Sequence, residues 1–107
     1  MYKIGLCQGR HRIECVEDYI FPQEVNPLDP DGLRESALRK LKEVYGASKG
    51  NLWGRELHIY VTGLSVALVA ALDAALSLAL SVTVWHYDRE SGEYYPQKLS
   101  VNTDLLA

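Results

Sequence analysis

The sequence has little positive charge for its size. It holds 11 lysine and arginine residues against 14 aspartates and glutamates, which gives a formal net charge of −3. Proteins that coat duplex DNA or RNA need a basic surface. The balance therefore argues against duplex nucleic acid as a partner, although one local basic cluster can still bind an anionic ligand.

Cysteine is also scarce. The only two, Cys7 and Cys15, lack the C-x-x-C spacing of zinc sites and are too few for a disulfide framework. We therefore expect no metal, and nothing in the sequence points to a bound cofactor. The first residues have no charged and apolar leader with a small-residue cleavage site, so we expect a cytoplasmic protein.

No apolar stretch has the pattern of a membrane span. Residues 64–84 are mostly alanine, leucine and valine, but Ser65, Asp73, Ser77 and Ser81 interrupt them at multiples of four. This spacing predicts a narrow polar stripe along one helix face. We expect a buried helix followed by a strand, and no membrane as a partner.

The length of 107 residues, with 48% hydrophobic and 23% charged residues, predicts one globular domain over 1–107. Asp29 and Pro30 are typical of a helix start, and Gly46 of the residue that follows a helix end. Glu90 to Glu93 have turn chemistry, and Pro96 fits only an edge strand. The predicted elements are strands at 2–7, 57–62, 82–88 and from 94, an extended piece at 16–21, and helices at 30–45 and 65–79.

This order of elements predicts an α/β, Rossmann-like domain of two or three layers. Its sheet is mostly parallel, has about four strands, and ends in an antiparallel edge hairpin. Strand–helix–strand units place the carboxyl ends of three parallel strands at one sheet edge, where ligands of open α/β sheets bind. The loops at 8–12, 62–65 and 86–89 leave that edge.

Chemistry-bearing side chains are concentrated in those three loops. Guanidinium groups bind phosphate or carboxylate, and a helix start favours an anion. His11 and His86 are the candidate general acid or base, because histidine titrates near neutrality. The candidate ligand-binding residues are Gln8, Arg10, Arg12, Thr62, Gly63, Ser65, Asp88 and Arg89.

Plainer interpretations stay open at each position. The 62–65 segment is neither a P-loop nor a dinucleotide fingerprint, and it fits a tight turn capped by Thr62 or Ser65. The arginines fit a solvated loop, and His86 fits a strand histidine near the sheet end. The hairpin aromatics fit cross-strand pairs or a stacking surface for a base.

The run from Leu57 to Leu68, followed by Trp85-His86-Tyr87-Asp88-Arg89, resembles small Rossmann-like proteins of phage genomes and CRISPR loci. The functional group it is most similar to is the CRISPR-associated Rossmann-like (CARF-like) ring nucleases. The resemblance covers the C-terminal half and implies a homodimer that binds a cyclic oligonucleotide, with metal-independent cleavage in some members.

Two hypotheses follow. The first is a homodimeric domain that binds a phosphorylated nucleotide such as a cyclic oligonucleotide signal, with or without metal-independent cleavage of that ligand. The alternative is a protein-binding module, such as a phage-encoded inhibitor or adaptor, with no small-molecule site. For the homodimer, the interface is expected at the 65–79 helix or at the Tyr94-Tyr95 strand, because a helix that is apolar on nearly all sides needs a cover.

Overall fold

The computed structural model describes residues 2–9, 13–22, 25–46, 54–62 and 64–99. Within them the chain forms five strands and two helices, in an alternation typical of α/β proteins. In chain order these are β1 (Tyr2–Cys7), β2 (Tyr19–Phe21), α1 (Pro30–Val44), β3 (Glu56–Tyr60), α2 (Ser65–Ser77), β4 (Ser81–Asp88) and β5 (Glu93–Lys98).

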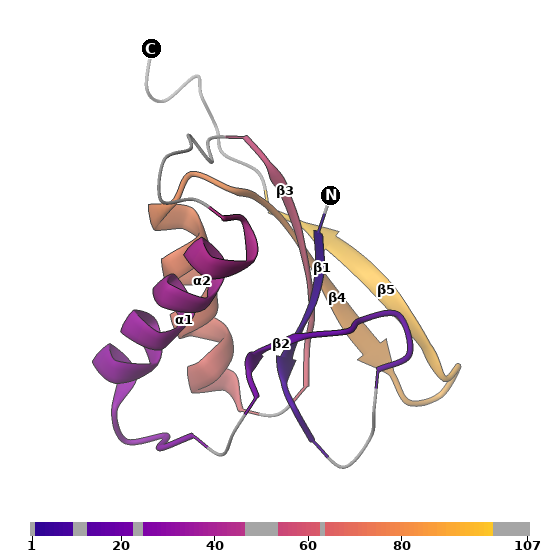
Figure 1. The fold of residues 1–107 in the computed structure, drawn as a ribbon. Coiled ribbons are helices and arrows are strands. Elements are labelled where there is room, and N and C mark those ends of the chain that lie inside the picture. Colours follow the sequence, from indigo (N-terminus) through magenta and orange to yellow (C-terminus); the bar gives the residue numbers. More distant parts are fainter. Residues whose placement is uncertain (1, 10–12, 23–24, 47–53, 63, 100–107) are drawn as a thin grey trace.

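All five strands belong to one sheet, in the order β2-β1-β3-β4-β5 (Figure 1). Every neighbouring pair is parallel except β4 and β5, which form an antiparallel hairpin at the edge. This confirms the predicted α/β fold with a mostly parallel sheet. The fifth strand is β2, which occupies only three residues of the extended piece predicted at 16–21.

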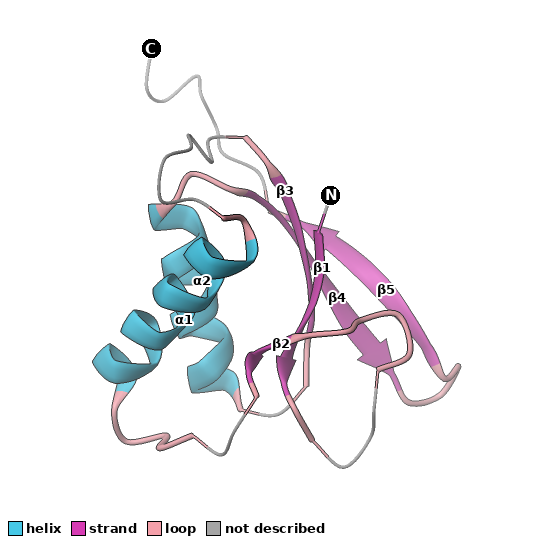
Figure 2. Cartoon of the chain, in the orientation of Figure 1, coloured by secondary structure: helices cyan, strands magenta, loops and turns pink. Residues whose placement is uncertain are grey.

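Both helices lie on the same face of the sheet, so the domain has two layers (Figure 2). The start of α1 follows its local chemistry. The Asp29 carboxylate accepts the Gly32 N–H at 3.1 Å, Pro30 takes the first helical position, and Gly46 follows the helix with a φ of 60°. The predicted start and end of this helix are confirmed.

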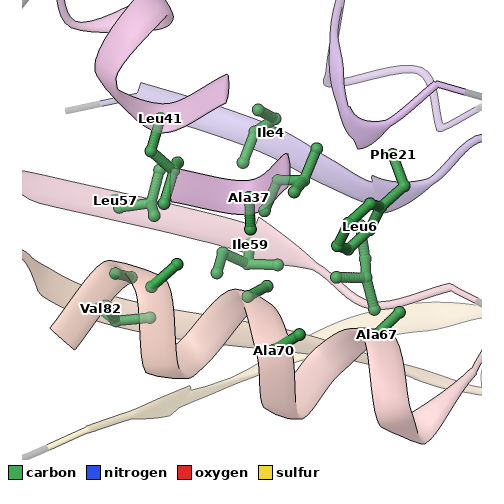
Figure 3. Packing of buried hydrophobic residues seen from close by; sticks show 14 of the residues in the cluster. Ile4, Leu6, Phe21, Ala37, Leu41, Leu57, Ile59, Ala67, Ala70 and Val82 are labelled. Atoms are coloured by element: carbon green, nitrogen blue, oxygen red, sulfur yellow. The ribbon is translucent and has the colours of Figure 1, made fainter. Parts of the chain in front are cut away.

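The main core lies between the helices and the sheet. Strand alternation points Leu57 and Ile59 of β3 toward the helices, where both are fully buried. Opposite them, α1 contributes Leu41, and α2 contributes alanines such as Ala70, which lets α2 approach the strands closely (Figure 3).

A second, smaller cluster lies on the face of the sheet that the helices leave open. It contains Ile13 and Val16 from the connection between β1 and β2, packed against Tyr60 of β3. This connection leads to a parallel neighbour on one side of β1, while α1 leads from β2 to β3 on the other side. Connections between parallel strands are right-handed, and two such connections that run in opposite directions across a sheet must lie on opposite faces of it. Because α1 lies on one face, residues 13–18 cover the other.

The predicted polar stripe of α2 has a different role from simple exposure to solvent. Asp73 and Ser77 both bind Arg34 of α1, at 2.8 and 3.2 Å, so this side of α2 contacts the other helix. Ser81 belongs to β4. In the part of the chain that the structure describes, neither helix has the length and apolar character to cross a membrane.

Candidate functional site

The strand order reverses between β1 and β3. The chain leaves β1 toward β2 on one side, then returns through α1 to β3 on the other side. The two loops that leave the carboxyl ends of β1 and β3 therefore run toward opposite faces of the sheet. In open α/β sheets such a reversal is where ligands bind. The fold thus selects the ends of β1 and β3 among the candidate positions.

A single threonine joins these two strand ends. The Thr62 hydroxyl accepts the Cys7 N–H at 3.2 Å and donates to the Cys7 carbonyl at 2.6 Å. One interpretation of the sequence has Thr62 capping α2, but its hydroxyl binds Cys7 instead. It extends the pairing of β1 and β3 beyond the last residues joined by backbone hydrogen bonds.

The N-terminus of α2 follows at the same edge. Its N-cap residue is Leu64, and no side chain of the described residues caps the helix there. Ser65, the first helical residue, is exposed. The prediction that Thr62 or Ser65 caps this helix is therefore wrong. The first N–H groups of α2 lack a side-chain acceptor, which is the condition under which a helix start favours an anion.

Cys7 lies close to that helix start. Burial raises the pKa of the Cys7 thiol, and the hydrogen bond from the Leu64 N–H only partly offsets this. The sulfur is therefore kept in its neutral thiol form at neutral pH, as expected for a strand cysteine that packs as a small apolar side chain. Cys7 is a structural neighbour of the edge and not an activated nucleophile.

Gln8 also lies at this edge, immediately after β1. Its backbone N–H donates to the Phe21 carbonyl at 3.1 Å, and its side chain is exposed. Topology therefore places Gln8, Thr62 and Ser65 at one end of the β1–β3 pair. Four further predicted site residues, Arg10, His11, Arg12 and Gly63, lie outside the described residues.

The remaining predicted residues belong to the hairpin. Trp85 is the last residue of β4 that is paired with β3, and β4 continues for three residues beyond it. In this extension His86 is aligned with Tyr95 of β5. The His86 Nε2 lies 2.8 Å from the Gln97 Oε1, which agrees with the plainer interpretation of a strand histidine. No hydrogen bond or ion pair within the described segments links His86 to Gln8, Thr62 or Ser65.

Asp88 and Arg89 form the turn of the same hairpin. Hydrogen bonds from the Ser91 hydroxyl and the Glu90 N–H lower the pKa of the Asp88 carboxyl, so this group stabilises the turn. Arg89 is exposed. The predicted cross-strand aromatic pairs are confirmed, since the rings of Tyr87 and Tyr94 lie 5.2 Å apart in an edge-to-face arrangement.

Sequence reasoning missed a polar contact on the open face. The Trp85 indole N–H donates to the His58 Nδ1 at 2.8 Å, so the proton of neutral His58 belongs on Nε2, which lies 3.8 Å from a Glu56 carboxylate oxygen. The alternation of 56, 58 and 60 along β3 was visible in the sequence. The parallel alignment of Tyr60 with Trp85 was not, and it is this register that brings the indole to His58.

A shallow hollow of about 400 Å³ lies elsewhere, beside the first half of α1. Its lining includes the carboxylates of Asp29 and Glu35 and the guanidinium of Arg39. Asp29 is already committed to capping α1. Two carboxylates against one guanidinium make this hollow a poor match for a phosphate group.

Among the described residues, no cluster of histidine, cysteine, aspartate and glutamate could hold a metal ion. Comparison with protein-family models, with curated proteins and with solved structures finds no match for this chain. The fold defines the class, an α/β domain with strand order 2-1-3-4-5.

Proposed function

We propose that this chain binds a phosphorylated nucleotide at the carboxyl ends of β1 and β3. The observation that carries the proposal is the reversal of the strand order at this point, together with the start of α2, which no described side chain caps. The reversal marks a position where ligands of open α/β sheets bind, and the helix start favours an anion there. The loop that follows β1 adds Arg10 and Arg12 in the sequence, which supply positive charge to a chain of net charge −3.

Each residue at the edge has a role in this proposal. The first N–H groups of α2 and the Ser65 hydroxyl donate hydrogen bonds to a phosphate, and the Gln8 amide contacts a base or a sugar. Thr62 positions the site, because its hydroxyl holds the two strand ends together. Arg10 and Arg12 pair with phosphate charge, and Gly63 lets the backbone approach the ligand.

A cyclic oligonucleotide is the ligand class that the resemblance implies. Such a ligand is larger than a mononucleotide, and it would extend toward the hairpin residues His86, Asp88 and Arg89. Metal-independent cleavage belongs to the same proposal. A ribose 2′-hydroxyl attacks the adjacent phosphorus and the 5′-oxygen leaves, which gives a 2′,3′-cyclic phosphate end; His11 or His86 takes the proton from the 2′-hydroxyl and returns one to the leaving oxygen.

The direct test is a thermal-shift and calorimetric screen of the purified protein. The probes are cyclic oligoadenylates, mononucleotides and inorganic phosphate. A ligand at 100 times its dissociation constant should stabilise the fold by about 2.7 kcal/mol. The double variant Arg10→Ala/Arg12→Ala should lose this stabilisation, whereas the matched control Arg39→Ala on α1 should keep it. Equal loss in both variants, or no stabilisation by any probe, would refute the proposal.

The alternative is a protein-binding module. The observation in its favour is the exposure of Val69 and Leu76 on α2, at 66% and 48%. Large apolar side chains that remain open on one helix mark a surface for another protein. The ligand screen separates the two functions, since a module of this kind responds to none of the nucleotides. Both proposals include a cytoplasmic location, which the two free thiols support.

A further inference from the structure

Helix α2 places its smallest residues inward and its largest outward. The side that faces the sheet and α1 consists of five buried alanines, at 67, 70, 71, 74 and 75. On the opposite side Val69 is 66% exposed and Leu76 is 48% exposed. A helix that serves only the core of its own domain has the reverse arrangement, with large apolar residues buried and polar residues outside.

The exposed residues Ser65, Val69 and Leu76, together with Leu72, which is half-buried and packs against the core, form a regular seam. Ser65, Val69, Leu72 and Leu76 follow each other at intervals of four, three and four residues. This is the spacing of the two contact positions in a heptad, which allows one helix to pack along another at a small crossing angle. The seam runs the length of the 13-residue helix, about 20 Å.

The helix layer also leaves one strand uncovered. A helix is about 10 Å wide and neighbouring strands lie about 4.8 Å apart, so two helices cover about four strands. Of the described elements, α1 contacts β2 and α2 contacts β1 and β4, whereas β5 lies beyond β4 at the edge of the sheet. The face of β5 on the helix side carries Tyr95, which is 53% exposed, and the exposed residues Glu93 and Gln97.

The seam on α2 carries no formal charge. Asp73 is the single ionisable residue of α2, and its carboxylate accepts the Arg34 Nε–H at 2.8 Å on the side that faces α1. A surface of this kind can meet an identical surface without burying like charges against each other. This property favours a second copy of the chain over a partner that is recognised by charge.

We propose that α2 is the interface of a homodimer, in which the α2 helices of two copies pack antiparallel along this seam. The twofold axis passes close to Leu72, so Val69 of one copy lies against Leu76 of the other. Such an interface is isologous, and the opposed helix dipoles favour it. It shares only Ser65 with the proposed nucleotide site, and the variants that test it leave Ser65 unchanged.

Sedimentation equilibrium tests this interface directly. The wild-type chain of 12.0 kDa should show twice that mass at micromolar concentration. Val69→Glu and Leu76→Glu should each weaken association ~10-fold or more, because each buries a carboxylate against an apolar side chain of the other copy. The matched control is Leu28→Glu, which adds the same charge at a residue that is 88% exposed and distant from α2 in sequence. Circular dichroism shows whether each variant is folded.

A charge-pair variant tests the orientation. In the antiparallel arrangement, Val69→Lys/Leu76→Glu places lysine opposite glutamate twice per dimer and should restore the dimer mass. In a parallel arrangement the same variant places like charges together and stays monomeric, which would overturn the proposed orientation. A monomeric wild type, or an equal loss of mass in Leu28→Glu and Val69→Glu, would overturn the interface itself.

Discussion

The Thr62 hydroxyl holds the ends of β1 and β3 together through both backbone groups of Cys7. The two contacts, at 3.2 and 2.6 Å, are partly buried and replace the next hydrogen bonds of the parallel ladder. The carboxyl edge is therefore held by one side chain, at the point where the strand order reverses. This gives Thr62 a measurable share of the stability of the fold.

Thr62→Val should lower the free energy of unfolding by about 1–3 kcal/mol, because valine has the same shape but leaves the N–H and carbonyl of Cys7 without a partner. Urea denaturation measures the change. The control is Thr62→Ser, which keeps the hydroxyl and should stay close to wild type. A Thr62→Val protein as stable as wild type would contradict the bridging role.

Gly5 of β1 lies directly against the ring of Tyr19. A Cβ at this position would lie 2.4 Å from the Tyr19 Cδ1 and 2.5 Å from its Cε1. Gly5→Ala must therefore displace the ring, whose hydroxyl accepts the Ile13 N–H at 3.2 Å. We expect a loss of about 1–3 kcal/mol.

A double-mutant cycle checks this cause. In a Tyr19→Ala background the methyl group added by Gly5→Ala meets no ring, so the substitution should cost much less there than in the wild type. Equal costs in the two backgrounds would show that the loss comes from the strand backbone and not from the ring.

How much of this architecture the sequence predicts depends on how local each signal is. The start of α1 is predicted well, because Asp29 and Pro30 act within one helical turn. The outward side of α2 is not predictable, since alanine, leucine and valine surround this helix and only tertiary packing selects the alanines for the core. The contact of His86 with Gln97 is not predictable from the sequence either, because it depends on the antiparallel register that aligns His86 with Tyr95.

Ala79 follows α2 with a φ of 58°, a backbone conformation that favours glycine. Ala79→Gly should therefore raise the free energy of unfolding by about 1 kcal/mol, because it removes the strain of a Cβ in the left-handed region. The control is Ala75→Gly inside the same helix, which should be destabilising by about 1 kcal/mol or more. Thermal unfolding of both variants measures these opposite signs, and a destabilised Ala79→Gly protein would contradict the expectation.

Alkaline pH should destabilise the fold through buried phenols. Burial raises the pKa of Tyr60 from 10.0 to about 12, and a hydrogen bond with Cys15 acts in the same direction. Between pH 10 and about 12, Tyr60 therefore keeps its phenolic proton in the folded state and loses it in the unfolded state. The contribution of the neutral Tyr60 phenol to the free energy of unfolding is fully present below pH 10 and is lost as the pH rises through about 12. The free energy of unfolding of Tyr60→Phe should fall less steeply than that of the wild type over this interval, and parallel curves would contradict the assignment to Tyr60.

Pro96 protects the outer edge of the sheet. The Trp85 carbonyl accepts the Val61 N–H at 2.9 Å, so the backbone groups of Trp85 face β3 and not β5. Pro96, which is aligned with Trp85, therefore has its backbone nitrogen on the outer side of β5, where an N–H would be open to another strand. Proline removes that donor and blunts the edge.

Pro96→Val restores the outward N–H and adds a residue that favours strands, so we expect species larger than a dimer to form at high concentration. Light scattering after size-exclusion chromatography measures their mass. The control is Gln97→Val, which adds the same side chain at a residue whose N–H already faces β4 and creates no new outward donor. Similar aggregation of the two variants would assign the effect to hydrophobicity, whereas aggregation of Pro96→Val alone would show that the missing N–H is what keeps β5 from pairing with another chain.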